Sequence, residues 1–429
     1  MTRRRAAAVY KSRAAAVYKS RAAAVYKSRA AAVSTSRAAA VALIFFVNGA
    51  VLGNWGPRIP AIAGELSLDA ATLGLALAGM GTGGLLATPL AALAIRARGS
   101  RVTTLASATL LSVAIVLPAL AGTWWSLGLA LMVLGAADAV MDVAMNAQGV
   151  LVENRSGRSI LNRLHAGWSA GAVTGGLVGA GAAALAVPVE LHFAVVATVL
   201  LALTVVTARH LEPDAGRRGP DSRAQPDGSG RQRRSAARRR SGTAAALALL
   251  GALVFVSSLV EDLPQSWGAL YATDLGAAPG PAGLTVVAFS TAMFVGRLVG
   301  DAVVDRVGRH RVLIGGAVAI ALAFLAAPWV TSPTVAVVMF AVAGLGAAPI
   351  FPAVFGMAGG LPGIAAGTAL SVVSLVARVG ILVAPLGFGT LAGQVGYGWA
   401  LWSMVGAGLA VAALAAVLRA RTSAHLPQR

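Results

Sequence analysis

The sequence lacks cysteine entirely, which excludes disulfides, thiol nucleophiles and cysteine-ligated metal sites. Charged residues are also scarce. They make up 12% of the 429 residues, whereas a soluble domain carries about a quarter. Hydrophobic residues make up 57%, and the mean hydropathy is +0.77. Such a composition indicates a protein whose main solvent is lipid.

Acidic residues are the rarest charged class, with 15 against 35 basic residues and a net charge of +20. The basic residues lie in tails and in connections between apolar segments, so we expect no nucleic-acid partner. A glycine-rich run at 79–84 lies inside an apolar segment and lacks the Lys-Ser/Thr of a phosphate-binding loop. No other enzyme or cofactor motif is present, so the sequence predicts neither an enzyme nor a cofactor.

Apolar segments long enough to cross a bilayer recur from residue 38 onward. The sequence therefore predicts an all-α integral membrane protein with twelve transmembrane helices. The expected spans are 39–58, 70–94, 102–121, 124–149, 161–186, 191–209, 243–264, 283–303, 311–330, 334–357, 364–391 and 397–418.

The distribution of basic residues predicts the topology. If the spans alternate in direction, 32 of the 35 Lys and Arg residues fall on one side of the membrane. Because basic loops remain in the cytoplasm, both termini are expected there. The remaining three arginines, Arg58, Arg297 and Arg378, lie within or at the ends of spans.

Composition divides the chain into five parts. Residues 1–37 form a basic tail in which Arg-Ala-Ala-Ala-Val recurs, either from a recent repeat expansion or as a basic helix lying on anionic lipid. Two six-helix halves are expected at 38–209 and 242–420. Between them, 210–241 has the composition of a disordered cytoplasmic linker, and 421–429 is a short C-terminal tail.

The two halves share short motifs at a nearly constant offset. Gly74-Leu75 matches Gly283-Leu284, and Gly99 matches Gly308, both 209 residues apart; Trp55-Gly56 matches Trp267-Gly268 at an offset of 212. A duplicated six-helix unit is typical of transporters built from parallel repeats.

A cluster of charge at 300–311 separates two apolar spans. Its Asp-Arg-x-Gly-Arg core resembles the cytoplasmic-loop motif of the major facilitator superfamily, a family of secondary transporters. The equivalent loop of the first half lacks most of these charges. The resemblance implies that this segment, the gate motif, closes the inner side of the transporter. Its candidate residues are Arg297, Asp301, Asp305, Arg306, Gly308 and Arg309.

Within that superfamily, three segments resemble the fucose-permease-like branch: 55–60, 141–148 and 261–267. This likeness implies proton-coupled uptake of a small polar, sugar-like solute. The alternatives are an exporter of a drug-like or metabolic compound by proton antiport and a membrane sensor that transports nothing. We expect a monomer in the inner (plasma) membrane of a bacterium, with a small-molecule substrate and H⁺ as partners.

Two carboxylates in the fourth span are candidates for proton coupling. Asp138, Asp142 and Asn146 recur at four-residue spacing and therefore share one helical face. Carboxylates inside a membrane must face a cavity or a partner, and burial disfavours their charged form. A role limited to hydrogen bonds between helices is the alternative.

Further candidates lie in the second half. Glu261 is a third proton-coupling candidate, and Pro264 is expected to break or kink its helix. Arg378, near the middle of the eleventh span, needs an anionic partner, for which Glu261, Asp262 or a substrate anion are candidates. The proposed substrate cavity draws on Trp55, Arg58, Asn146, Gln148, Trp168, Asp262, Gln265, Trp267 and Arg378.

Overall fold

The structure is a computed structural model that describes residues 36–156, 160–213, 233–364 and 366–423. All regular secondary structure in these ranges is helical. Eleven helices or helix pairs there are long and apolar enough to cross a membrane. A further helix, α6, runs through the same bundle, but its many glycines and a histidine make it less hydrophobic.

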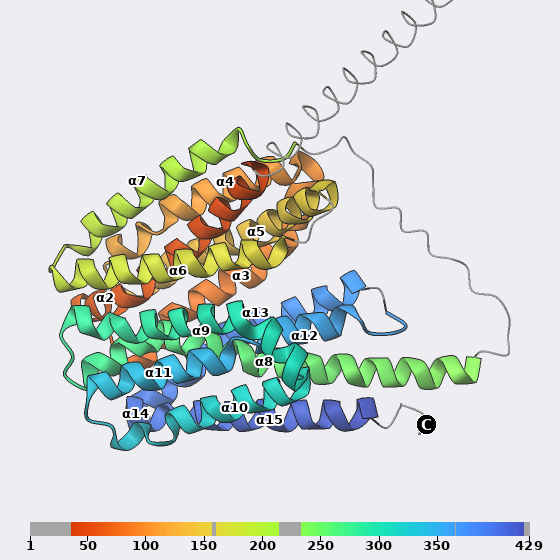
Figure 1. Cartoon of the computed structure of the whole chain (residues 1–429). Helices are drawn as coiled ribbons and strands as arrows, with labels where there is room; N and C mark the ends of the chain where they lie inside the picture. The colour runs from red at the N-terminus through yellow and green to blue at the C-terminus, as the bar shows by residue number, and fades with distance from the viewer. Residues whose placement is uncertain (1–35, 157–159, 214–232, 365, 424–429) are drawn as a thin grey trace, which may run out of the picture.

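The helices of residues 36–208 form the first bundle (Figure 1). The first helix covers 36–55 and continues through a 3₁₀ turn into a short helix. The remaining bounds are η1 Gly56–Arg58, α2 Ile59–Glu65, α3 Ala70–Arg98, α4 Ser100–Ala114, η2 Leu117–Leu120, α5 Trp124–Ser156, α6 Leu161–Ala184 and α7 Val189–Ala208.

The helices of residues 233–423 form the second bundle (Figure 1). Their bounds are α8 Arg233–Asp274, α9 Pro279–Val307, α10 Arg309–Leu325, η3 Ala327–Trp329, α11 Pro333–Ala347, α12 Ile350–Gly359, α13 Ala366–Val395, α14 Tyr397–Ala400 and α15 Trp402–Ser423. They coincide with the predicted spans to within a few residues at most ends.

The structure differs from the prediction at three points. α8 begins at Arg233, inside the segment expected to be linker, where alanine and arginine favour a helix. It also continues through Pro264 without a break. The span expected at 334–357 is present as one candidate span, Pro333–Gly359, but it consists of two helices, α11 and α12, which meet at Pro349, because proline cannot donate the backbone hydrogen bond of a continuous helix. Residues 1–35 and 214–232 lie outside the described part of the chain.

The two bundles meet along two helix pairs, α3 with α13 and α6 with α9. Figure 1 shows the bundles converging at the end that carries α2 and α14 and separating toward the opposite end. The glycines of the shared Gly-Leu motif, Gly74 and Gly283, support a structural repeat between the two bundles. A Cβ on Gly74 would lie 2.4 Å from the Pro385 carbonyl of α13, and a Cβ on Gly283 would lie 3.0 Å from Ala180 of α6. The 209-residue echo therefore marks equivalent contacts between the bundles.

The other shared glycines occupy equivalent turns. Gly99 joins α3 to α4 with φ +85°, and Gly308 joins α9 to α10 with φ +91°. Residues other than glycine rarely adopt this backbone conformation, because their Cβ clashes with the neighbouring carbonyl. A glycine is therefore required at the sharp reversal in both bundles.

Replacing Gly308 by alanine is expected to lower the free energy of unfolding by about 1–3 kcal/mol through backbone strain alone. No atom lies within 4 Å of the added Cβ. Gly300→Ala is the matched control. Gly300 also has open space, but it lies inside α9, where alanine is the better helix former. Thermal unfolding in detergent should separate the two variants; equal melting temperatures would contradict the role of the turn.

Candidate functional site

The candidate site begins on α5, where helical geometry places Asp138, Asp142 and Asn146 on one face. Asp138 lies fourteen residues from the start of the helix, about 21 Å along its axis. Asn146 donates to the Asp142 carbonyl oxygen at 2.9 Å and to its Oδ1 at 3.1 Å. This contact leaves the second carboxylate oxygen of Asp142 for another partner.

That partner is Arg378 of α13, in the other bundle. Its Nη2 lies 3.3 Å from Asp142 Oδ2, and its Nη1 lies 3.9 Å from Asp138 Oδ2. A Cβ on Gly84 of α3 would lie 3.2 Å from Arg378 Nη1, so this glycine leaves room for the guanidinium. One cation of the second bundle therefore connects two carboxylates of the first.

Two residues of other helices complete this arrangement. Asn48 of the first helix donates to Asp138 Oδ1 at 2.9 Å, and Trp168 Nε1 of α6 donates to Asn48 Oδ1 at 2.7 Å. Asn48 is absent from the sequence-based candidates, although an asparagine within an apolar span is itself a signal. We call the set Asn48, Asp138, Asp142, Asn146, Trp168 and Arg378 the central polar cluster.

A second ion pair lies between α8 and α9. Arg297 Nη2 approaches Glu261 Oε1 at 3.1 Å. The expected pairing of Arg378 with Glu261 or Asp262 is therefore wrong: the reach of α13 across to α5 gives Arg378 the two aspartates. Arg297 belongs to this partly buried pair rather than to the exposed loop of the gate motif.

Asp262 and Gln265 lie on the same part of α8. Ser266 is the one hydrogen-bond donor to Asp262 in the described residues, at a long 3.4 Å, and no described cation pairs with this carboxylate. The Gln265 carbonyl lies against η1, because a Cβ on Gly56 would be 2.9 Å from it. Asp262 is thus a carboxylate with little compensation inside a membrane-spanning helix.

Three other cavity candidates are buried against their own neighbours. Trp55 lies beside the ring of Phe193, and Arg58 donates to the Val187 carbonyl at 2.6 Å. Trp267 is fully buried beside the rings of Phe388 and Tyr397. These contacts place them in the packing between helices, away from the central polar cluster.

Gln148 lies in another buried network, at the end of the first bundle where α3 turns into α4. It donates to Ser100 Oγ at 2.7 Å and to the Glu212 carbonyl at 3.1 Å, and its own oxygen accepts from the Glu212 backbone. The Glu212 carboxylate in turn forms ion pairs with Arg37 and Arg155. This network fastens the chain after α7 to the first helix and α5.

The loop of the gate motif is exposed. Asp305, Arg306, Gly308 and Arg309 are all solvent-accessible at the junction of α9 and α10. No ion pair within the described residues involves these charges. The side chain of Asp301 lies outside the described part of the structure.

Carboxylates outnumber their cationic partners on α5 and α8. In the described residues, four partly buried carboxylates, Asp138, Asp142, Glu261 and Asp262, have only the guanidinium groups of Arg297 and Arg378 as ion-pair partners. Asp142 is 45% exposed, against 15% for Arg378 and 18% for Asp138. Because unpaired carboxylates are costly within a membrane, this arrangement favours the binding of protons or polar groups. Asp142 is the most accessible of the charges in the central polar cluster.

Comparisons with known proteins agree with this architecture. The family model described as Major Facilitator Superfamily matches residues 41–265 and 250–428. An uncharacterised MFS-type transporter of Yersinia pestis is 32% identical over 353 residues, which cover 82% of this chain and 87% of that protein. Membrane protein MosC of Rhizobium meliloti is 31% identical over 86% of this chain and 87% of its own length.

Two solved structures have a similar fold. The nucleoside transporter NupG superposes with a TM-score of 0.67 at 12% identity, covering 89% of this chain and 98% of its own. A bacterial homologue of the lysosomal transporter Spinster, inward-facing and unoccupied, gives a TM-score of 0.65 at 15% identity, with 90% and 97% covered. At these identities the likeness shows the fold alone.

Proposed function

The chain belongs to the major facilitator superfamily of transporters, and from this premise we propose that it is a proton-coupled transporter of a small, sugar-like polar solute. The observation that carries the proposal is the ion pairing of Arg378 with Asp138 and Asp142 across the two bundles. The resemblance of 55–60, 141–148 and 261–267 to the fucose-permease-like branch supports the substrate class.

We propose a topology of two six-helix halves with both termini in the cytoplasm of a bacterial cell, the protein acting as a monomer in the plasma membrane. The basic residues support this orientation. In it, the converging ends of the bundles face outward and the separated ends face the cytoplasm (Figure 1). The conformation described is then open to the inside.

Alternating access would rock the halves about the central polar cluster. Protonation of Asp138 or Asp142 neutralises a carboxylate that pairs with Arg378, and this weakens the connection between the halves. Asn48, Asn146 and Trp168 supply the uncharged hydrogen-bonding groups that suit a hydroxyl-rich solute. Glu261 is the next candidate for the proton, because its pair with Arg297 repeats the same chemistry.

The exposed gate motif fits this conformation. Asp305, Arg306 and Arg309 would pair with helix ends when the inner side closes, so their lack of described partners is expected in an inward-open state. Figure 1 places the α9–α10 junction at the separated end of the bundles.

The proposal is tested in proteoliposomes with an imposed pH gradient. A panel of labelled monosaccharides, nucleosides and polyols is offered, and uptake is measured with the gradient intact and after a protonophore. Accumulation that the protonophore abolishes supports proton coupling and identifies the solute. Expulsion of a drug-like compound from the same vesicles would favour antiport instead.

Single cysteines should establish the topology, because the natural chain contains none. Arg98 and Asp274 are both exposed, at opposite ends of the bundles. We expect Asp274→Cys to react with an impermeant maleimide in intact cells and Arg98→Cys to react only after permeabilisation. Labelling of both from outside would contradict the proposed orientation.

A further inference from the structure

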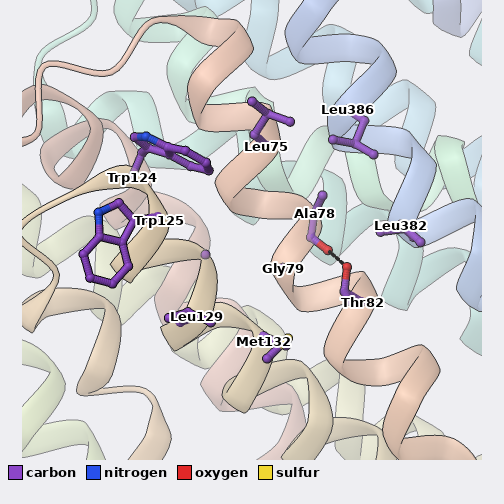
Figure 2. Close-up of a pocket in the computed structure, with 11 residues that line it drawn as sticks. Leu75, Ala78, Gly79, Thr82, Trp124, Trp125, Leu129, Met132, Leu382 and Leu386 are labelled. Atoms are coloured by element: carbon purple, nitrogen blue, oxygen red, sulfur yellow. Dashed lines mark hydrogen bonds between the residues drawn. The ribbon is translucent and has the colours of Figure 1, made fainter.

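An apolar groove opens on the side of the molecule, where α3 and α5 of the first bundle meet α13 of the second. Its volume is about 450 Å³, within the range of small-molecule sites. Figure 2 shows Leu75 on α3, with Leu382 and Leu386 facing it from α13 and Trp124, Trp125 and Leu129 on the other side.

The groove offers almost no polar group to a ligand. Thr82 is the one hydroxyl in its lining, and that hydroxyl donates to the Ala78 carbonyl at 2.9 Å (Figure 2). Buried water needs two to four polar partners, and a sugar needs more. The indole N–H groups of Trp124 and Trp125 are the remaining side-chain donors. The lining therefore excludes the polar solute proposed for the central polar cluster.

The groove opens toward lipid. All its lining residues belong to three candidate membrane spans, Ala70–Arg98, Trp124–Arg155 and Thr368–Val395. Leu75 and Leu129, on its two walls, are 53% and 51% exposed. Leu75 and Thr82 lie five and twelve residues from the start of α3, which places the groove about 8–18 Å deep along the helix. Hydrocarbon chains are the material present at that depth.

Two tryptophans stand at the shallow end of the groove. Trp124 and Trp125 begin α5 and remain about half exposed. Tryptophan is enriched at the level of lipid headgroups, where its ring lies in the apolar region and its N–H meets polar groups. The groove thus has the polarity profile of a phospholipid: a headgroup level at one end and an apolar channel below it.

The groove is also continuous with the joint between the bundles. A Cβ on Gly81 of α3 would lie 2.5 Å from the Cα of Leu382, so the two backbones touch directly beside the groove. A bound chain would contact α3 and α5 on one side and α13 on the other. Its binding surface exists only while α3 and α13 remain packed together.

We propose that this groove binds one acyl chain of a membrane phospholipid and that the bound chain stabilises the conformation in which α3 packs on α13. The lipid then acts as a ligand that binds only the conformation in which α3 packs on α13. Any motion that parts α3 from α13 loses its contacts, so lipid occupancy shifts the equilibrium toward the described conformation.

Photolabelling tests the site. The full chain is reconstituted with a phosphatidylethanolamine that carries a diazirine at mid-chain, and adducts are mapped by mass spectrometry. We expect them to concentrate on the groove's lining, including Leu382 and Leu386. Leu129→Trp and Leu75→Trp fill the groove from opposite exposed walls and should reduce those adducts at least fivefold. Leu93→Trp, equally exposed on α3 but outside the groove, should not.

Adducts spread evenly over the exposed leucines, or unchanged in both groove-filling variants, would overturn the acyl-chain site. Displacement of the label by a transported solute would overturn it as well, since the groove would then be a solute path.

A second measurement tests the link to conformation. Spin labels at Arg98→Cys and Val307→Cys report the separation of the inner ends of α3 and α9, two exposed positions on different bundles. Adding phospholipid to delipidated protein should at least double the population with separated ends. The same addition should change little in Leu75→Trp, whose groove is filled. An equal response of both proteins would overturn the conformational part of the proposal.

Discussion

Asp142→Asn is expected to abolish accumulation of the solute against a gradient while leaving solute binding and exchange in place. The amide has the size of the protonated carboxyl group but cannot release a proton. Asp142 is the more exposed of the two aspartates, so a proton can reach it. It contacts Asn146 and Arg378, so a change in its charge alters both interactions. Uptake driven by a pH gradient should fall at least tenfold, measured beside counterflow in the same vesicles.

Asp138→Asn is the matched variant for this experiment. Asp138 receives a hydrogen bond from Asn48 and lies farther from Arg378, at 3.9 Å against 3.3 Å. We expect a smaller loss of accumulation and a larger loss of solute affinity. If both single variants and the double variant accumulate solute with normal pH dependence, the proton travels through another group, and Glu261→Gln becomes the next test.

The membrane fold could be predicted from the sequence because its signals are local. Apolar length defines a span wherever it occurs, and basic loops separate the two sides. Gly99 and Gly308 were recognisable as equivalent from their offset, and both have positive φ. Apolar length predicts the span at 334–357, but it does not reveal that this span consists of two helices that meet at Pro349.

The partners of the buried charges could not be predicted, because each pair joins residues far apart in the chain. Arg378 was expected to meet an acid of its own half, whereas it lies 236 positions from Asp142. Gln148 and Asp142 both belong to the segment 141–148, yet Gln148 joins the hydrogen-bond network around Glu212. Six residues on a helix rotate a side chain by about 600°, so neighbours in a motif need not share a face. Asn48 is different, because a polar residue within an apolar span marks a candidate from the sequence alone, and it does bond to Asp138.

Removing Arg378 is expected to have the largest effect on stability of any change in the central polar cluster. Arg378→Ala leaves Asp138 and Asp142 without their cation inside the membrane. Breaking a fully buried pair costs about 3–5 kcal/mol, and the 45% exposure of Asp142 lowers this to roughly half. We therefore expect a lower melting temperature together with complete loss of transport.

A second-site change separates this electrostatic effect from a general packing defect. In Arg378→Ala, adding Asp142→Asn removes one of the two uncompensated charges and should restore part of the melting temperature without restoring transport. Arg297→Ala is the control, because its partner is Glu261, so Asp142→Asn should not rescue it. If Arg378→Ala melts like the natural protein, or if Asp142→Asn rescues both arginine variants equally, Arg378 does not connect the two bundles through these aspartates. The selectivity of the rescue thus decides whether charge pairing or side-chain volume makes Arg378 stabilise the contact of α13 with the first bundle.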